Sequence, residues 1–148
     1  MLESTIDKYI EYLTHLKVSH SGGFKAPHKA VLMITVTESV RDGIICSPVI
    51  VKDDYLKNAF TKNWHRFIQI NTPFVGKLDM PFNHIGSEKF VVETSLEAFE
   101  IDRDLFFLMQ DQECSEKIIS TLISAYLAPF AFQHKVDFNE LNPYRDKT

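Results

Sequence analysis

Cysteine and glycine are scarce in this chain, and a long apolar run and an excess of basic residues are both missing. The two cysteines, Cys46 and Cys114, lie far apart without a Cys-x-x-Cys spacing, so neither a disulfide framework nor a zinc site is indicated. Five glycines do not make a glycine-rich phosphate loop. No run approaches the roughly 20 apolar residues that cross a bilayer, and the acidic N-terminus is unlike a signal peptide. We therefore expect a cytoplasmic protein without membrane contact.

The net charge of -4 is unevenly distributed along the 148 residues. Residues 1–90 hold 11 Lys and Arg against 9 Asp and Glu, whereas residues 91–148 hold 5 against 11. A chain this acidic is not a non-specific nucleic-acid-binding protein, because such affinity comes from many Lys and Arg side chains that neutralise phosphates. Either the N-terminal part faces a polyanion locally, or the charge is scattered surface charge.

Periodic apolar residues predict four helices in one domain. The spacing favours helices over about 3–17, 27–41, 53–68 and 115–127, the second of them nearly continuous in apolar residues and therefore buried. Short β-branched runs at Ile44–Cys46 and Val49–Val51 favour a small hairpin. Ser95 or Asp102 is expected to cap short helical pieces. The expected fold is α+β, a mostly helical single domain over 1–148, with its core at about 3–130 and a loose C-terminal tail.

The segment Met80–Phe90 is predicted to be a second hairpin, extending to Glu93. Gly86 and Ser87 suit a tight turn, and a proline at position 81 favours the start of an edge strand because it lacks an N–H. An edge strand with a proline, an aromatic ring, an amide and an imidazole is either a ligand-binding wall or ordinary hairpin sequence.

Catalysis and metal binding find little support in the sequence. The six histidines form no His-x-x-x-His or His-Glu-x-x-His pair, and neither cysteine lies in a reactive turn. Asn83-His84 shares two letters with a His-Asn-His nuclease, but the remaining ligands and base are missing. We expect no catalytic residue, metal or cofactor.

Several motifs together resemble a known family. They are Gly22-Gly23-Phe24-Lys25-Ala26-Pro27-His28-Lys29-Ala30-Val31-Leu32-Met33, Asp42-Gly43-Ile44, Phe60-x-x-x-Trp64, Pro81-Phe82-x-His84-Ile85 and Phe90. Over about residues 5–128 the chain resembles the sulfur-binding domain of McrA-type restriction endonucleases, which recognises phosphorothioate-modified DNA. Met80 stands where the family usually has Tyr, Lys25 where an Arg often stands, and Ala30 where Pro is usual.

The resemblance implies a winged-helix-like core and a sulfur pocket. Pro81 would supply an apolar wall, His84 a pocket position, and Lys25 a basic residue near the glycine loop. The pocket residues would be Met80, Pro81, Phe82, Asn83, His84 and Lys25. Contacts to the DNA backbone would come from His20, His28, Lys29, Lys57, Lys62, Arg66 and Lys89, although solvent exposure or a capping role remains an alternative for these.

The chemistry of sulfur explains such a pocket. Sulfur in place of a nonbridging phosphate oxygen is larger, softer and less hydrated, so an apolar wall accepts it at little desolvation cost. We expect a module that binds phosphorothioate-modified double-stranded DNA without nuclease activity of its own, working alone or with a separately encoded nuclease of a restriction system. The alternative is a protein-interaction or regulatory domain that has kept the fold and lost sulfur recognition.

Overall fold

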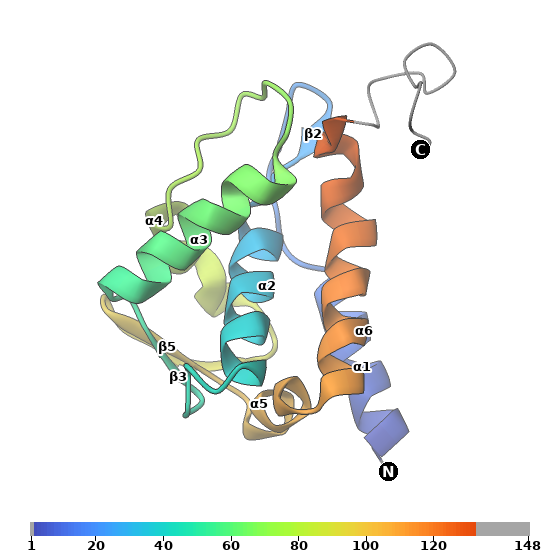
Figure 1. The fold of residues 1–148 in the computed structure, drawn as a ribbon, viewed down its shortest axis with the longest axis vertical. Helices are drawn as coiled ribbons and strands as arrows, with labels where there is room; N and C mark the ends of the chain where they lie inside the picture. The colour runs from blue at the N-terminus through green and yellow to red at the C-terminus, as the bar shows by residue number, and fades with distance from the viewer. Residues whose placement is uncertain (1, 133–148) are drawn as a thin grey trace.

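Helix α2, His28–Arg41, is the centre of the fold (Figure 1). The computed structural model describes residues 2–132 of the chain, and within them α2 packs against α3, α4, α5 and α6. Nearly all of its residues are buried, as the continuous apolar pattern predicts. Pro27 precedes the helix, and Gly43 follows it with φ of 79°, a left-handed conformation that glycine adopts at little cost.

The other helices lie around α2, with α1 packed on α5 and α6. They are α1 at Leu2–Thr14, α3 at Asp54–Phe67, α4 at Asp79–His84, α5 at Arg103–Gln110 and α6 at Gln112–Leu122. A π-helical turn η2, Ile123–Leu127, and a 3₁₀ helix η3, Ala128–Phe130, continue α6. The predicted helices α1, α2, α3 and α6 are confirmed. Helix α1 ends at Thr14 rather than near residue 17, and α6 begins at Gln112 rather than Ser115 and gives way to η2 after Leu122. Asp53 caps α3 as expected, because its carboxylate accepts the Leu56 N–H at 2.9 Å.

Two small antiparallel sheets complete the structure. A two-stranded ribbon pairs β1, His20–Ser21, with β2, Phe24–Lys25, around two glycines of positive φ. A three-stranded sheet has the order β3-β5-β4, formed by Val49–Val51, Ala98–Ile101 and Val91–Thr94. Ile50 and Phe99 lie opposite each other and are fully buried, so this sheet covers the core with one face.

The predicted hairpin at Met80–Glu93 is wrong. Asp79–His84 forms α4, and Ile85–Ser87 forms the 3₁₀ helix η1, so Gly86 and Ser87 lie in a helical turn. Pro81 is the third residue of α4, where the backbone N–H has no helical partner and its absence costs nothing. Residues 81–84 therefore belong to a short helix and not to an edge strand.

The strand pairing is also different from the expected one. β4 turns back through residues 95–97 onto β5, and β3 pairs with β5 rather than with the Ile44–Cys46 segment, which forms no strand. Ser95 closes the β4–β5 turn, its N–H bonding the Ala98 carbonyl at 2.8 Å, and caps no helix. Asp102 does precede α5, as expected, but its side chain does not bond the helix and accepts the Tyr9 hydroxyl instead.

The described residues form a single α+β domain, which confirms the predicted class. Four apolar residues after the last helix, Phe130, Phe132, Val136 and Phe138, are predicted from the sequence to pack back on the body. Phe130 is buried, whereas Phe132 is 55% exposed. Val136, Phe138 and the loose tail predicted at Asn142–Thr148 lie outside the described residues. Within residues 2–132, none of the helices has the length and apolar content required to cross a membrane.

Candidate ligand-binding pocket

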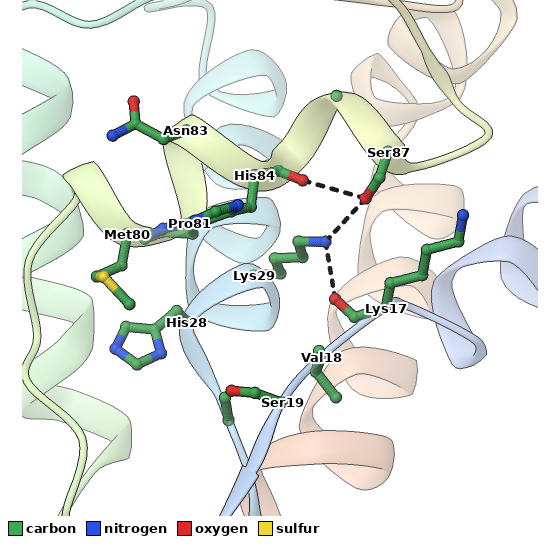
Figure 2. A pocket seen from close by; sticks show the side chains of 12 residues that line it. Lys17, Val18, Ser19, His28, Lys29, Met80, Pro81, Asn83, His84 and Ser87 are labelled. Atoms are coloured by element: carbon green, nitrogen blue, oxygen red, sulfur yellow. Dashed lines mark hydrogen bonds between the residues drawn. The ribbon is translucent and has the colours of Figure 1, made fainter.

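A cavity of about 600 Å³ opens where three segments of the chain meet (Figure 2). These segments are residues 17–19 after α1, the start of α2, and the α4–η1 region. The lining residues are Lys17, Val18, Ser19, Ala26, His28, Lys29, Met80, Pro81, Asn83, His84, Gly86 and Ser87. The lining includes two lysines and two histidines and, among these described residues, neither Asp nor Glu.

Helix α4 supplies the apolar and polar groups of one wall. Pro81 is buried, while Met80, Asn83 and His84 are exposed, so a prolyl ring and a thioether lie beside an amide and an imidazole. The helix begins after Leu78, which is 5% exposed and anchored in the core with Phe82. Burial of these two apolar side chains fixes the orientation of α4 and so determines which of its other side chains line the pocket.

His28 forms an aromatic part of the pocket with the rings behind it. Its Nε2 donates to the Val75 carbonyl at 2.7 Å, and its ring lies 4.8 Å from the Trp64 ring and 5.7 Å from the Phe74 ring, measured between centroids. Burial lowers the pKa of His28 below the ordinary value, opposed in part by the bond to Val75. At neutral pH His28 is therefore an uncharged ring.

Lys29 lies in the pocket lining with its ammonium bound on all sides. Its Nζ donates to Glu88 Oε2 at 2.6 Å, to the Lys17 carbonyl at 2.7 Å and to Ser87 Oγ at 3.4 Å. The Lys29 and Glu88 side chains are only 7% and 4% exposed. The ion pair joins α2, the segment after α1, and η1, and so holds together the three segments that form the pocket.

The start of α2 faces this region without a capping group. Pro27 occupies the N-cap position without a side-chain hydrogen bond, and the first turn carries no acidic residue. The positive end of the helix dipole is therefore not neutralised within the helix itself, which favours an anion nearby.

The structure brings together some of the predicted site residues. Met80, Pro81, Asn83, His84, His28 and Lys29 line the same cavity. Phe82 does not, because it is 4% exposed and packs against Phe99 with ring centroids 5.1 Å apart. Phe82 is therefore a core residue, and its predicted place in the pocket lining is wrong.

Other predicted residues lie outside the cavity. Lys25, on β2, extends over the Tyr126 ring at 5.5 Å, and Lys89 lies 5.7 Å from the Tyr12 ring. His20 on β1 and Lys57 on α3 are exposed and do not line the pocket.

Two basic residues of α3 line a separate groove. Lys62 and Arg66 line a cavity of about 650 Å³ between α2 and α3, together with the acidic Glu38 and Asp42. Arg66 donates to Glu38 at 2.9 Å. Lys62 and Arg66, expected to contact the DNA backbone, therefore do not lie around the α4 pocket.

Sequence reasoning missed half of the lining. The unpredicted residues are Lys17, Val18, Ser19, Ala26, Gly86 and Ser87. Ala26 belongs to the Gly22–Met33 motif, and Gly86 and Ser87 belong to the Met80–Phe90 segment, so the sequence gave a signal for these three residues. Lys17–Ser19 has no pattern of its own in the sequence. It is held here by the hydrogen bond from the Ala26 N–H to the Ser19 carbonyl, at 2.8 Å, and by the bonds of Lys17 to Lys29 and Glu88.

Within the described part of the chain, no group of three or more His, Cys, Asp or Glu side chains has an arrangement able to hold a metal ion. The chain matches no protein-family model, and no curated protein sequence matches it either.

Proposed function

We propose that the protein is a DNA-binding module whose α4 pocket receives a phosphorothioate group of modified double-stranded DNA. The observation that carries the proposal is the composition of the pocket, in which a prolyl ring and a thioether adjoin imidazoles, an amide and a helix start, with no carboxylate in the lining. Such a site suits a ligand that is anionic and weakly hydrated. The resemblance of the Pro81–Ile85 and Gly22–Met33 motifs to sulfur-binding domains supports the same ligand.

The selectivity follows from desolvation. A phosphate oxygen against the Pro81 and Met80 carbons loses water hydrogen bonds without equal replacement, a penalty of roughly 1 to 3 kcal/mol. Sulfur loses less, because it is the weaker hydrogen-bond acceptor. Each 1.4 kcal/mol is a factor of ten, so the pocket favours the thio-substituted group by about tenfold to a hundredfold.

The arrangement of elements supports a winged-helix reading of the fold. A winged helix runs helix, strand, helix, helix and hairpin, and its first strand pairs with its last. From α2 to β5 the chain has the same order, and the sheet order β3-β5-β4 has the same pairing. In this reading α4 is the recognition helix, the element that contacts DNA bases in helix-turn-helix proteins. Its exposed Met80, Asn83 and His84 then face the duplex.

The charge distribution agrees with this orientation. All pocket residues come from the part of the chain that carries more Lys and Arg than Asp and Glu. Lys17, exposed at the pocket, is suited to an ordinary phosphate contact that fixes register on the duplex. The module acts without cleaving DNA, alone or with a separately encoded nuclease.

The test compares three duplexes of one sequence by fluorescence anisotropy. Two carry a single phosphorothioate of defined stereochemistry, and the third carries oxygen only. We expect a preference of about tenfold to a hundredfold for one stereoisomer. Equal binding of all three, or no binding, would refute sulfur recognition and favour the protein-interaction alternative.

Two substitutions locate the preference in the pocket. Pro81→Ala removes the ring and His84→Ala the imidazole, and each should reduce the preference with little change in melting temperature. The matched control is His65→Ala, an exposed histidine on α3 outside the pocket, which should keep the preference. If the control behaves like His84→Ala, the pocket is not the site.

A further inference from the structure

Each hydrogen-bond donor of Lys29 already has an acceptor within the protein, the one in Ser87 being the most distant. An ammonium has three N–H groups, and those of Lys29 have three acceptors in Glu88, the Lys17 carbonyl and Ser87. Ser87 in turn donates to the His84 carbonyl at 3.2 Å, which fixes the hydroxyl beside the pocket (Figure 2). A lysine that the sequence offers as a phosphate contact is thus fully bound inside the protein.

Glu88 lies behind this lysine and is itself absent from the pocket lining. Its Oε2 accepts both the Lys29 ammonium at 2.6 Å and the Lys17 backbone N–H at 2.9 Å. The pair has no net charge. Because both side chains are almost completely buried, water does not screen them, and the loss of one charge would act on the pocket directly.

We propose that Glu88 determines the ligand class of the pocket: by neutralising Lys29, it makes the site select a soft, weakly hydrated thio-substituted phosphate over an ordinary phosphate. The inference rests on the proposed function and adds the residue that sets its specificity. Glu88 acts through Lys29 and is a positioning residue that does not touch the ligand.

The physical reason is the replacement of lost hydration. An ordinary phosphate oxygen is a strong acceptor, and an uncompensated ammonium beside it would replace the water it loses on binding. Such a site would bind every phosphate. When Glu88 neutralises the ammonium, a phosphate oxygen gains no interaction there that replaces its lost hydrogen bonds to water. Sulfur is less hydrated and therefore loses less.

The test is Glu88→Gln, a change of charge with almost no change of shape. The Gln oxygen can keep both hydrogen bonds of Oε2, so the packing remains while Lys29 becomes an uncompensated cation. The long bond to Ser87 can then be exchanged for a ligand oxygen. We expect the oxygen duplex to bind about tenfold more tightly, which reduces the sulfur preference toward unity. The dependence of log affinity on log salt should steepen by about 0.9 for one new phosphate contact.

Two further variants separate this effect from others. Glu97→Gln removes the same charge from the exposed turn between β4 and β5 and should leave the preference unchanged. Lys29→Gln combined with Glu88→Gln restores a neutral pair and should restore the preference. If Glu88→Gln does not fold, the double variant decides, since a folded double variant without preference contradicts the inference.

The outcomes distinguish the inference from the proposed function. A wild-type protein that binds the sulfur and oxygen duplexes equally refutes the proposed function. A wild-type protein with a preference that Glu88→Gln retains, with unchanged oxygen affinity and salt dependence, overturns only the role of Glu88. Weaker binding of both duplexes by Glu88→Gln would also overturn it, because a purely structural residue gives that result.

Discussion

Gly76 is the point at which the loop from α3 to α4 crosses the Trp64 ring. A Cβ at this position would lie 2.5 Å from three atoms of the indole, Cγ, Cδ1 and Cδ2. Real Cβ atoms do not approach this closely, and the neighbour here is a ring that is 7% exposed, not the free end of a flexible side chain. Gly76→Ala must therefore displace either the loop or Trp64.

The expected cost has two parts. Overpacking against a buried ring costs about 1 to 3 kcal/mol. Displacement of the loop would also break the hydrogen bond from His28 Nε2 to the adjacent Val75 carbonyl, which contributes about 1 kcal/mol. Together Gly76→Ala should lower the free energy of unfolding by about 2 to 4 kcal/mol. At about 3 °C per kcal/mol for a chain of this size, the melting temperature should fall by about 6 to 12 °C.

Thermal and urea unfolding followed by circular dichroism measure this change. The control is Gly86→Ala, whose Cβ meets the Thr94 methyl at 2.9 Å where both residues are exposed, so a small side-chain movement relieves the contact. In a Trp64→Leu background the effect of Gly76→Ala should shrink, because the ring that it strikes is gone. A Gly76→Ala protein as stable as the wild type would refute the packing of this loop on Trp64, and with it the support behind His28.

The remaining predictions concern two titrating groups. Because the folded pKa of His28 lies below its unfolded value near 6.5, the unfolded chain binds the proton first. The contribution of this residue to stability is present above pH 6.5 and declines as the pH falls. Between pH 7.5 and 5.5, the free energy of unfolding measured in urea should therefore decrease less in His28→Phe than in the wild type. An equal decrease in both proteins would contradict the lowered pKa. Burial, with the nearby Asp111 carboxylate, raises the pKa of Cys114 to about 11, whereas Cys46 is exposed. A thiol reagent at pH 8 should therefore modify Cys46 rapidly and Cys114 only upon unfolding, and a fast reaction in Cys46→Ser would refute the burial of Cys114.

Local signals account for the helices that the sequence predicts. In α2 and α3 the apolar spacing, the capping Asp53 and the stop at Gly43 all lie within a few residues of the feature that they specify. Local signals did not predict helix α4, because a single proline supports two interpretations. Pro81 fits an edge strand and also the first turn of a helix, and the choice is made by Leu78 and Phe82, whose burial requires the helical spacing of four.

The strand pairing in the three-stranded sheet could not be predicted from the sequence for a different reason. β3 pairs with β5, with Ile50 opposite Phe99, and nothing near β3 in the sequence specifies a partner so distant. The Ile44–Cys46 run is closer to β3 and richer in β-branched residues than β5, so both signals favoured the wrong pairing. Such a choice depends on which side chains complete the core, a property of the assembled chain.

Lys29 shows why the candidate site could be found from the sequence while its electrostatics could not. Counting charges places a lysine beside a helix start and suggests a phosphate contact, and the structure does place Lys29 in the pocket lining. Its partner Glu88 is 59 residues away, and the short distance between Lys29 Nζ and Glu88 Oε2 changes the lysine from a free cation into half of a neutral pair. In the proposed function, a pocket whose point charge is neutralised discriminates by hydration and not by charge. We therefore infer that the negative residue behind the pocket, and not the positive residues around it, determines which phosphate the pocket would accept.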